Sequence, residues 1–365
     1  MAHLGVSIYP SKSSLEDMKT YLEEAANIGY SRVFTSMLEL SDNPSETIKL
    51  FKDIITFGND LGMRTSIDVN PRLFDKLGVS YQDLKFFKDL GVWSIRLDEG
   101  FTGLEEAQMT LNPYDLIIEL NISRGQHYID MVMDFGADNQ HLIGSHNFYP
   151  QTYAGLEFDY FIETTKDYKK HNLLTAAFID SESGGVGPWP HSDLMVSTEV
   201  QRNLSITSQA QLLKMTGYID DLFISSSLVA KEELEAVYKI FHTNKPVLTV
   251  AVEKETSDVE VELVTSPIHY YRGDYSGYMI RSSQTRLTYR GSDFPAHTTE
   301  ALKKGDVVIC NNQSGQYKGE LQLILKDRPN DGNYNRVARI IDDCLPILDK
   351  IKLWQPFLLI IDKEA

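Results

Sequence analysis

The sequence predicts an α/β protein of two domains, with a (β/α)8 barrel over residues 1–243 and a smaller β-rich barrel over residues 244–365. The first observation is that eight short apolar runs alternate with amphipathic stretches before residue 243, which is the length and rhythm of a TIM barrel. The second is that the rest of the chain is strand-rich, with turn residues between short apolar runs. An open, doubly wound sheet is the competing architecture. No G-x-G-x-x-G segment follows the first strand, which argues against its dinucleotide-binding form.

The strands of the barrel are expected where the short apolar runs occur, at residues 4–8, 32–37, 64–69, 92–97, 114–120, 141–146, 173–179 and 221–225. Helices are expected in the amphipathic stretches between them, including residues 14–28, 45–61, 81–90, 125–135, 158–171 and 230–242. Asn43 or Ser45 can cap the second helix, with Pro44 near its first turn. Gly29 and Gly91 follow the first and third helices, where a left-handed residue commonly ends a helix.

The pattern changes near residues 244–246, and turn residues such as Gly305 and Asp306 separate the apolar runs that follow. Strands are expected at residues 247–253, 259–264, 278–280, 307–310, 321–325 and 357–361. One helix is expected near residues 336–344. These elements predict a second, mostly antiparallel β domain.

Composition excludes several classes of function. The 35 basic and 52 acidic residues give a net charge of −17, which opposes binding to nucleic acid or to an anionic membrane. A few local arginines can still bind a small anion. The two cysteines, Cys310 and Cys344, are too few for a disulfide framework or a cysteine-rich metal site. Without a signal-peptide pattern or a long apolar run, we expect a soluble, cytoplasmic protein. No cofactor is predicted.

Polar residues in phase near the ends of the barrel strands are the candidate catalytic groups. Active sites of (β/α)8 barrels lie at the C-terminal ends of the strands, and alternate side chains of each strand point inward. The acidic residues that meet both conditions are Asp68, Asp98, Glu119 and Asp180, and the polar residues that accompany them are Arg96, Asn70 and Asn121. We expect all of them to converge at one mouth of the barrel.

Each carboxylate also has a structural alternative, as the cap of a helix or the partner of an arginine. Four carboxylates at one rim are harder to explain in this way, because like charges raise each other's pKa and cost stability. Arg96 is either the counter-ion of the cluster or a clamp for a substrate carboxylate, and the sequence leaves both roles open.

Residues 144–150, after the sixth strand, read GSHNFYP and supply His146, Asn147 and Tyr149. Such a set suits sugar hydroxyls and ring faces, although a buried, hydrogen-bonded core histidine is the alternative for His146. No histidine spacing indicates a metal site, and none is predicted, although metal binding through the carboxylate cluster stays open as an alternative. The Gly/Pro-rich loop at residues 184–191 is either a lid over the mouth or a passive surface loop.

In the second domain, the run RSSQTR at residues 281–286 brings two arginines and three hydroxyl groups together. Arginine forks with hydroxyl donors suit a phosphate or a carboxylate, and a solvated strand edge is the alternative. Arg281 with Ser282 is the preferred pair, because Arg281 and Arg286 share a face only if a turn or bulge intervenes.

Five segments together resemble a known family. They are GVSIYP (residues 5–10), IRLDEGF (95–101), GSHNFYP (144–150), GPWPH (187–191) and RSS (281–283). They are similar to a bacterial family once labelled as outer surface proteins and now associated with 6-phospho-N-acetylmuramidase activity. The resemblance runs the full chain, and it implies a TIM barrel followed by a small cyclophilin-like β barrel.

The resemblance also implies an intracellular glycosidase of cell-wall (peptidoglycan) recycling. Its substrate partner would be a phosphorylated amino-sugar disaccharide, N-acetylmuramic acid 6-phosphate linked to N-acetylglucosamine. Glycoside hydrolysis needs a protonated carboxyl and a second group at the anomeric carbon. We expect Asp98 and Glu119 to be that pair, with Asp68 and Asp180 in support. Whether the second group is a carboxylate or the substrate's own acetamido group stays open.

The phosphate and the lactyl carboxylate of such a substrate need cations. We expect Arg96, Arg281 and Arg286 to supply them, so that the second domain completes the active site. The alternative is that other cations of the first domain, such as Arg124 or Arg202, bind the phosphate.

Two other classes of function remain open from the residues alone. One is a phosphosugar isomerase, epimerase or aldolase on the same fold, although no lysine lies among the inward positions at strand ends. The other is a non-enzymatic, surface-associated carbohydrate-binding protein, against which the missing signal peptide and lipidation cysteine argue. The oligomeric state is not predicted.

Overall fold

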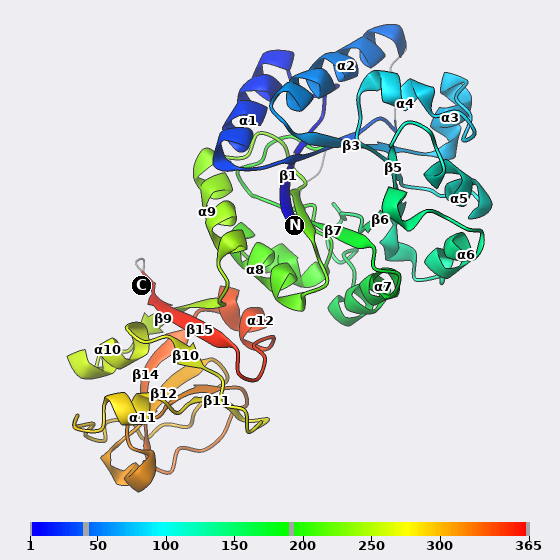
Figure 1. Cartoon of the computed structure of the whole chain (residues 1–365). Coiled ribbons are helices and arrows are strands. Elements are labelled where there is room, and N and C mark those ends of the chain that lie inside the picture. Colours follow the sequence, from blue (N-terminus) through cyan, green and yellow to red (C-terminus); the bar gives the residue numbers. More distant parts are fainter. Residues whose placement is uncertain (1, 39–43, 190–192, 363–365) are drawn as a thin grey trace. The chain divides into compact units, whose positions relative to one another are not determined.

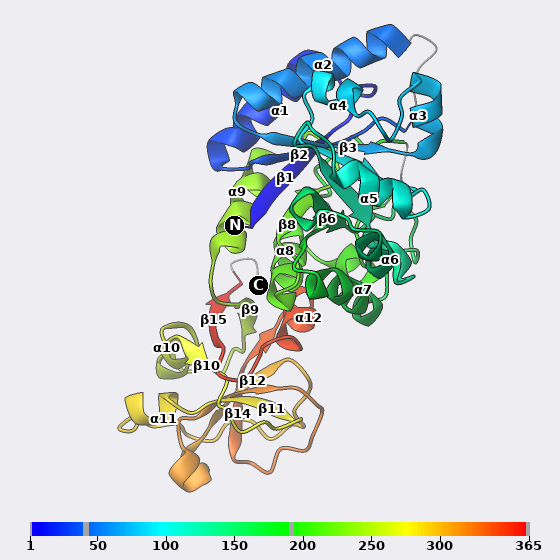
Figure 2. The ribbon, with the colours of Figure 1, turned by 45° about the vertical axis from the view of Figure 1, so that its right-hand side comes forward.

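The structure is a computed structural model that describes residues 2–38, 44–189 and 193–362. The chain forms two compact units, Met1–His242 and Thr243–Ala365, seen in Figures 1 and 2. No described helix is long and apolar enough to cross a membrane.

Eight parallel strands of the first unit form a closed barrel in sequence order, and the pairing of His3 with Asp221 joins the first strand to the eighth. The strands are β1 (His3–Ile8), β2 (Arg32–Ser36), β3 (Arg64–Val69), β4 (Ser94–Leu97), β5 (Ile117–Asn121), β6 (Leu142–Ser145), β7 (Leu174–Ile179) and β8 (Asp221–Ile224). The predicted (β/α)8 barrel is therefore confirmed.

Helices surround this barrel (Figure 1). They are α1 (Leu15–Ile28), α2 (Pro44–Asp60), α3 (Pro71–Leu77), α4 (Lys85–Leu90), α5 (Leu104–Thr110), α6 (Tyr128–Asp134), α7 (Phe158–Lys170), α8 (Ile206–Thr216) and α9 (Lys231–His242). Short 3-10 turns are η1 (Ile122–Arg124), η2 (Asn139–His141) and η3 (Glu199–Asn203). Gly29 ends α1 at φ 120° and Gly91 ends α4 at φ 93°, as their positions predicted. The proposed cap Asn43 and the end of the predicted lid, residues 190–191, lie outside the described residues.

Strand alternation sends successive side chains to opposite faces of the barrel wall, one packed against the helices and the other pointing into the barrel. Ile67, Ile95 and Ile118 belong to the apolar cluster between the barrel and its helices. Inside the barrel, Phe178 packs edge-on against Phe34 in an aromatic cluster. The polar residues that alternate with the isoleucines therefore also point into the barrel, which is where the candidate site begins.

The second unit contains a seven-stranded mixed sheet in the order β10-β15-β9-β14-β12-β13-β11. Its elements are β9 (Val247–Val252), α10 (Asp258–Thr265), β10 (His269–Tyr270), β11 (Met279–Ser282), α11 (Thr285–Thr288), β12 (Asp306–Cys310), η4 (Asn312–Tyr317), β13 (Leu321–Ile324), β14 (Tyr334–Ile340), η5 (Asp342–Cys344), α12 (Leu345–Leu348) and β15 (Pro356–Ile361). The pair β9–β15 is parallel, and the other pairs are antiparallel.

Two predicted elements of this unit were wrong. Residues 259–264, expected as a strand, lie in α10, because Glu260 accepts hydrogen bonds from the backbone N–H and hydroxyl of Ser257 at 2.9 and 2.8 Å and so caps the helix. Residues 336–344, expected as a helix, begin inside β14, which pairs with both β9 and β12. Val337 and Ile340 have helical spacing but are buried in this inner strand.

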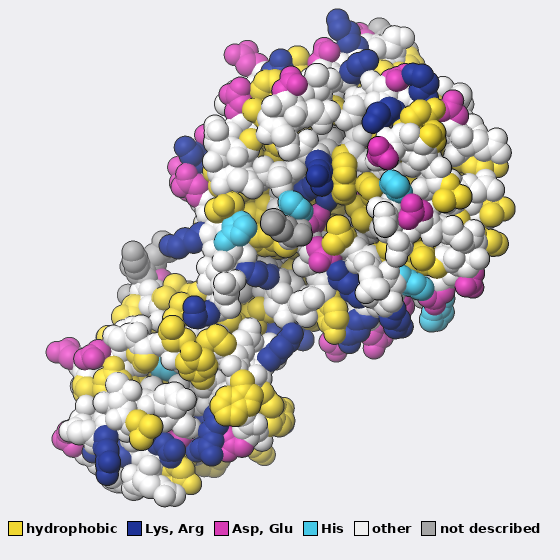
Figure 3. All heavy atoms as spheres, viewed as in Figure 1, with side chains coloured by type: hydrophobic (Ala, Val, Ile, Leu, Met, Phe, Trp, Pro, Cys, Tyr) yellow, Lys and Arg dark blue, Asp and Glu magenta, His cyan; other side chains and the backbone are white. Residues whose placement is uncertain are grey.

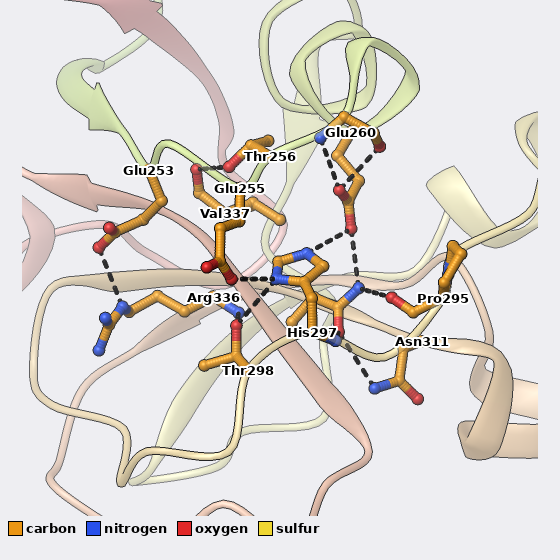
Figure 4. A network of polar contacts seen from close by, with 12 residues as sticks. Glu253, Glu255, Thr256, Glu260, Pro295, His297, Thr298, Asn311, Arg336 and Val337 are labelled. Carbon is orange, nitrogen blue, oxygen red and sulfur yellow. Dashed lines mark hydrogen bonds and ion pairs between the residues drawn. The ribbon is translucent and has the colours of Figure 1, made fainter.

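Glu260 also fastens α10 to the sheet, as Figure 4 shows. Its Oε1 accepts a hydrogen bond from Asn335 on β14 at 2.9 Å and lies 3.3 Å from Nε2 of His297. Because Glu260 is 1% exposed, these bonds satisfy a charge that would otherwise be costly to bury.

Candidate active site

An ion-paired cluster lies at the C-terminal ends of β3 and β4, which form part of the barrel mouth. Nη1 of Arg96 lies 2.6 Å from Oδ1 of Asp68 and 3.6 Å from Oδ1 of Asp98. Asp68 and Arg96 are direct neighbours across the two strands. The Asp68 side chain is 7% exposed and that of Asp98 is 33% exposed, so the second carboxyl lies on the solvent side. Figure 3 shows charged side chains of both signs near the centre of the barrel face turned to the viewer.

The environment of Asp68 favours its protonated form. Burial raises the pKa of Asp68 to about 7, with the charges of Asp98 and Glu119 adding to the effect and Arg96 opposing it. Burial lowers the pKa of Arg96, but the three neighbouring carboxylates outweigh this and raise its pKa, so the guanidinium stays charged. Asp68 can therefore hold or release a proton near neutral pH.

The remaining donors of Arg96 are used inside the barrel. Its Nε donates to Oγ of Ser145 at 2.8 Å, and its Nη2 donates to Oδ1 of Asn147 and, at 3.4 Å, to the carbonyl of His146. Of the two roles that the sequence left open for Arg96, this geometry favours the counter-ion that fixes Asp68. Ser145 is a contact that the sequence analysis missed, although it lies at the end of β6 in the inward phase.

Glu119 shares the inward phase but its carboxylate lies deeper than the mouth. Its Oε2 accepts hydrogen bonds from the hydroxyls of Ser66 at 3.0 Å and Ser94 at 3.1 Å. Ser66 lies two residues before Asp68 on β3, and Ser94 lies two residues before Arg96 on β4. Arg32 lies 3.9 Å from the same oxygen. The expected pairing of Asp98 with Glu119 at one height is therefore not what the structure has, because the Glu119 side chain reaches toward the N-terminal end of the barrel.

Asp180 holds two loops together. One oxygen accepts the backbone N–H of Ser226 at 2.9 Å and its hydroxyl at 2.5 Å, and the other accepts the N–H of Met195 at 2.6 Å. Burial raises the pKa of Asp180, although these hydrogen bonds oppose the effect. These side-chain contacts join the segments that follow β7 and β8, and within the described part of the chain Asp180 forms no hydrogen bond or ion pair with Asp68, Arg96 or Asp98.

Three other predicted residues have mainly positioning roles. Asn70 caps α3 by accepting the N–H of Leu73 at 2.9 Å. Asn121 donates to the carbonyl of Asp98 at 3.1 Å and so orients that residue. His146 is fully buried, its Nε2 lies 2.7 Å from Oγ1 of Thr165, and burial lowers its pKa to about 3. His146 is thus a neutral core histidine, which corrects its expected contact with substrate.

Tyr149 remains close to the cluster. Burial raises the pKa of its hydroxyl, and the charges of Arg96 and Asp98 also act on it. A pocket of about 120 Å³ lies beside the ends of β4 and β5, and Asn121 and Arg124 are among its lining residues. The Arg124 side chain is exposed and forms no ion pair with the described residues. It is an exposed cation just after the C-terminal end of β5.

The arginines of the second unit come together around one acid. Arg281 binds Glu320 through Nε at 2.7 Å and Nη2 at 3.1 Å, and Nε of Arg286 lies 3.6 Å from the same carboxylate. The short helix α11 provides the turn that allows both to meet there. Ser282 instead is buried and lies 3.0 Å from Nδ1 of His269, so the expected pair of Arg281 with Ser282 does not form.

Among the described residues, no group of three or more His, Cys, Asp and Glu is placed to hold a metal ion. What the mouth does hold is a buried acid that titrates near neutral pH beside a second, more exposed carboxyl. On a TIM barrel this arrangement suits acid–base chemistry, of which glycoside hydrolysis is one example.

Comparison with known families specifies the class. The family described as 6-phospho-N-acetylmuramidase matches the chain twice, with its N-terminal part over residues 4–239 and its C-terminal part over residues 246–360. The chain belongs to this family, and its activity is that of a 6-phospho-N-acetylmuramidase, a glycoside hydrolase. The resemblance inferred from the five sequence segments is confirmed.

Solved structures agree with this fold. An uncharacterized B. cereus protein is 40% identical, with a TM-score of 0.87 over 98% of this chain and 99% of that chain. A conserved Enterococcus faecalis protein of unknown function is 24% identical, with a TM-score of 0.75 over 99% and 97% of the two chains, and it supports the fold alone. The comparison with curated proteins gives no match.

Proposed function

We propose that the first unit hydrolyses the bond between N-acetylmuramic acid 6-phosphate and N-acetylglucosamine in a disaccharide, with Asp68 as the general acid. The observation that carries this assignment is the buried Asp68 carboxyl, whose pKa is raised to about 7 at the mouth of the barrel. Asp68 gives its proton to the oxygen of the leaving sugar. A carboxyl that is still protonated near neutral pH is what this step needs.

Arg96 lowers the cost of that proton transfer. When Asp68 loses its proton it becomes an anion, and the guanidinium already lies 2.6 Å away. The attraction between the two groups is therefore stronger after the transfer than before it. Interactions that strengthen along the reaction accelerate the chemical step, whereas those present equally at the start do not.

Asp98 is the proposed second group. Oδ1 of Asp68 lies 2.6 Å and Oδ1 of Asp98 lies 3.6 Å from the same nitrogen, Nη1 of Arg96. These two oxygens are therefore at most roughly 6 Å apart. Inverting glycosidases separate their carboxyls by about 6.5–9.5 Å to admit a water molecule, so the shorter separation favours retention of configuration. In this proposal Asp98 either attacks the anomeric carbon or orients the substrate's acetamido group for that attack.

The other predicted acids have supporting roles in this proposal. Glu119 adds negative charge that raises the pKa of Asp68, and Asp180 keeps the loops after β7 and β8 in place. Asn147 and Tyr149 border the cluster and are proposed to contact the sugar. For the phosphate we propose Arg124, because it is exposed near the end of β5 and forms no ion pair with the described residues, whereas Arg281 and Arg286 are both already paired with Glu320.

The disaccharide and its origin in peptidoglycan recycling are part of the proposal, as is a cytoplasmic location. A 6-phosphorylated sugar supports that location, because such sugars arise where phosphorylation takes place, inside the cell. The chain has two cysteines in 365 residues, and so low a cysteine content suits a reducing compartment. The cyclophilin-like character of the second unit is likewise proposed from the resemblance.

The experiment that tests the proposal incubates the purified protein with the phosphorylated disaccharide and measures the release of N-acetylglucosamine, with and without EDTA. We expect hydrolysis in both conditions and a much slower reaction of the unphosphorylated disaccharide, because phosphate contacts supply binding energy for the reacting centre. Equal rates on the two substrates contradict phosphate recognition. Absence of hydrolysis contradicts the glycosidase mechanism and favours the isomerase, epimerase or aldolase alternatives.

A further inference from the structure

Aromatic rings line one side of the barrel mouth. Phe34 on β2, Phe178 on β7 and Phe223 on β8 belong to a buried cluster inside the barrel. The ring of Phe148, which follows β6, packs against Phe34 and Phe178, whose centroids lie 6.0 and 5.1 Å from its own. The Trp189 indole, carried by the segment after β7, lies 6.2 Å from the Phe148 ring with 32° between the two planes. Trp189 is 42% exposed, so the rings lead from the core to an indole that faces solvent.

The segments that carry the two outer rings are held in place. In the segment after β6, the carbonyl of Asn147 accepts a hydrogen bond from the hydroxyl of Ser197 at 2.8 Å. In the segment after β7, the carbonyl of Val186 accepts one from the N–H of Ser227 at 2.8 Å, and the Val186 side chain packs against the buried aromatic cluster. The indole face is therefore formed before a ligand arrives, and binding to it needs little ordering of the protein.

The aromatic side of the mouth adjoins the charged cluster. Asn147, which accepts a hydrogen bond from Nη2 of Arg96, immediately precedes Phe148 in the chain. Strand β2, which carries Phe34, pairs with β3, which carries Asp68. The mouth thus has a charged side at β3, β4 and β5 and an aromatic side at β2 and at the ends of β6, β7 and β8. The Asp68–Arg96 pair lies where the two sides meet.

The exposed indole face suits a neutral pyranose ring. N-acetylglucosamine carries its ring substituents in equatorial positions, so each face of the ring presents C–H groups that can stack on an aromatic ring while the hydroxyls at its edge stay hydrated. Such stacking removes apolar surface of both partners from water. Phe148 and Trp189 carry no charge, whereas Arg124 is exposed on the charged side. A ligand with one phosphorylated and one neutral ring therefore matches the mouth when its neutral ring lies on the aromatic side.

We propose that Trp189 and Phe148 form the subsite for the unphosphorylated N-acetylglucosamine ring, which stacks on the exposed face of the Trp189 indole. The cleaved bond then lies over the Asp68–Arg96 pair, between the two sides of the mouth. This inference rests on the proposed function, because it takes the two rings of that disaccharide as the ligand. It makes Trp189 a specificity-determining residue for the sugar without phosphate.

The first test measures binding without catalysis, by fluorine NMR of the full-length protein labelled with 5-fluorotryptophan. The chain has three tryptophans, Trp93, Trp189 and Trp354, and the Trp189→Phe variant assigns the signal of interest. We expect N-acetylglucosamine to shift the Trp189 signal in a saturable way and to leave the Trp354 signal unchanged. Sorbitol, a polyol without a ring, should leave both unchanged at the same concentration.

The second test separates stacking from a merely structural role, by kinetics on the phosphorylated disaccharide. Trp189→Ala removes the ring, and we expect KM to rise about 10-fold or more while kcat falls less than about 3-fold, because stacking is equally present in the bound substrate and the transition state. Trp189→Phe keeps a ring and should restore most of the affinity. Trp354→Ala is the matched control, because Trp354 is 68% exposed on the second unit, and it should leave the kinetics unchanged.

No shift of the Trp189 signal at about 100 mM N-acetylglucosamine, or an equal shift with sorbitol, overturns the proposal. So does a Trp189→Ala variant whose KM is unchanged, or whose loss of kcat/KM comes mainly from kcat. A Trp189 signal that moves with protein concentration in the absence of sugar shows that a second copy of the chain covers the indole, which also overturns it. If the hydrolysis assay fails, the shift still tests the sugar subsite, and if hydrolysis proceeds without the shift, only this inference fails.

Discussion

Replacing Asp68 with asparagine should abolish most of the activity and yet stabilise the protein at alkaline pH. The asparagine side chain has nearly the same shape but carries no titratable proton. Loss of a general acid typically costs about 10²–10⁴ in rate, which is the expected decrease in kcat/KM. In the unsubstituted enzyme, kcat/KM should decline as the pH rises through about 7, because Asp68 then loses the proton that it must donate.

The effect on stability follows from the direction of the pKa shift. Burial raises the pKa of Asp68 from 3.8 to about 7, so the folded state holds a proton that the unfolded chain releases. The contribution of this residue to stability is complete below about pH 3.8 and is lost progressively as the pH rises to about 7. Three pKa units correspond to about 4 kcal/mol at about 1.36 kcal/mol per unit, which is an upper limit on the loss.

The Asp68→Asn variant escapes this loss. Arg96 keeps Asp98, Ser145 and Asn147 as partners, so the substitution does not isolate its charge. We therefore expect the variant to melt several degrees above the unsubstituted protein at pH 8 and to gain much less at pH 5.

Thermal unfolding followed by circular dichroism at the two pH values measures the difference. Asp115→Asn is the matched control, since the Asp115 side chain is 94% exposed and its φ of 57° is one that asparagine tolerates. A variant that is less stable than the unsubstituted protein at pH 8, or a gain that is equal at both pH values, refutes the argument about the pKa of Asp68. Retention of near-full activity refutes its role as the acid.

Three further predictions test neighbouring parts of the site. Proton NMR of the reaction should show that the sugar released at the cleaved bond first appears with retained anomeric configuration; initial inversion contradicts the pairing of Asp68 with Asp98. Arg124→Ala should slow the phosphorylated substrate at least 10-fold more than the unphosphorylated one, whereas Arg281→Ala should affect both equally; the reverse result returns phosphate binding to the second unit. Glu119→Gln should lower the pKa of Asp68, so that the alkaline decline of kcat/KM moves to lower pH; an unchanged profile contradicts the electrostatic coupling between them.

The barrel could be predicted because its signal is periodic and local. Buried strands alternate with amphipathic helices, and the positions of Gly29 and Gly91 mark helix ends that need a positive φ. The second unit was harder to predict, because the spacing of its apolar residues fits both the period of a helix and that of a strand. Val337 and Ile340 have the spacing of a helix, and only pairing on both sides makes their segment a strand.

The sequence predicts which side chains of the site point into the barrel, but not which partners those side chains bind. Strand phase correctly turned Asp68, Arg96 and Glu119 inward. Phase fixes the direction in which a side chain leaves the backbone, but not how far along the barrel it reaches. The Glu119 side chain is long enough to bind serines that lie two residues nearer the N-terminal end of the barrel. Asp180 accepts hydrogen bonds from backbone N–H groups whose positions depend on the loops that carry them. Neither outcome has a signal in a single sequence.

Arg96 explains how one barrel mouth can keep an acid protonated and still use it. An aspartate in water ionises well below neutral pH and has no proton to give, whereas an isolated buried aspartate keeps its proton too firmly to give it away. Burial and the charges of Asp98 and Glu119 push the pKa of Asp68 upward, and Arg96 pulls it back to about 7. Ser145 and Asn147 hold the guanidinium in place, so this balance is set before substrate arrives. The catalytic property thus belongs to the arrangement of the three carboxylates around one arginine rather than to Asp68 alone.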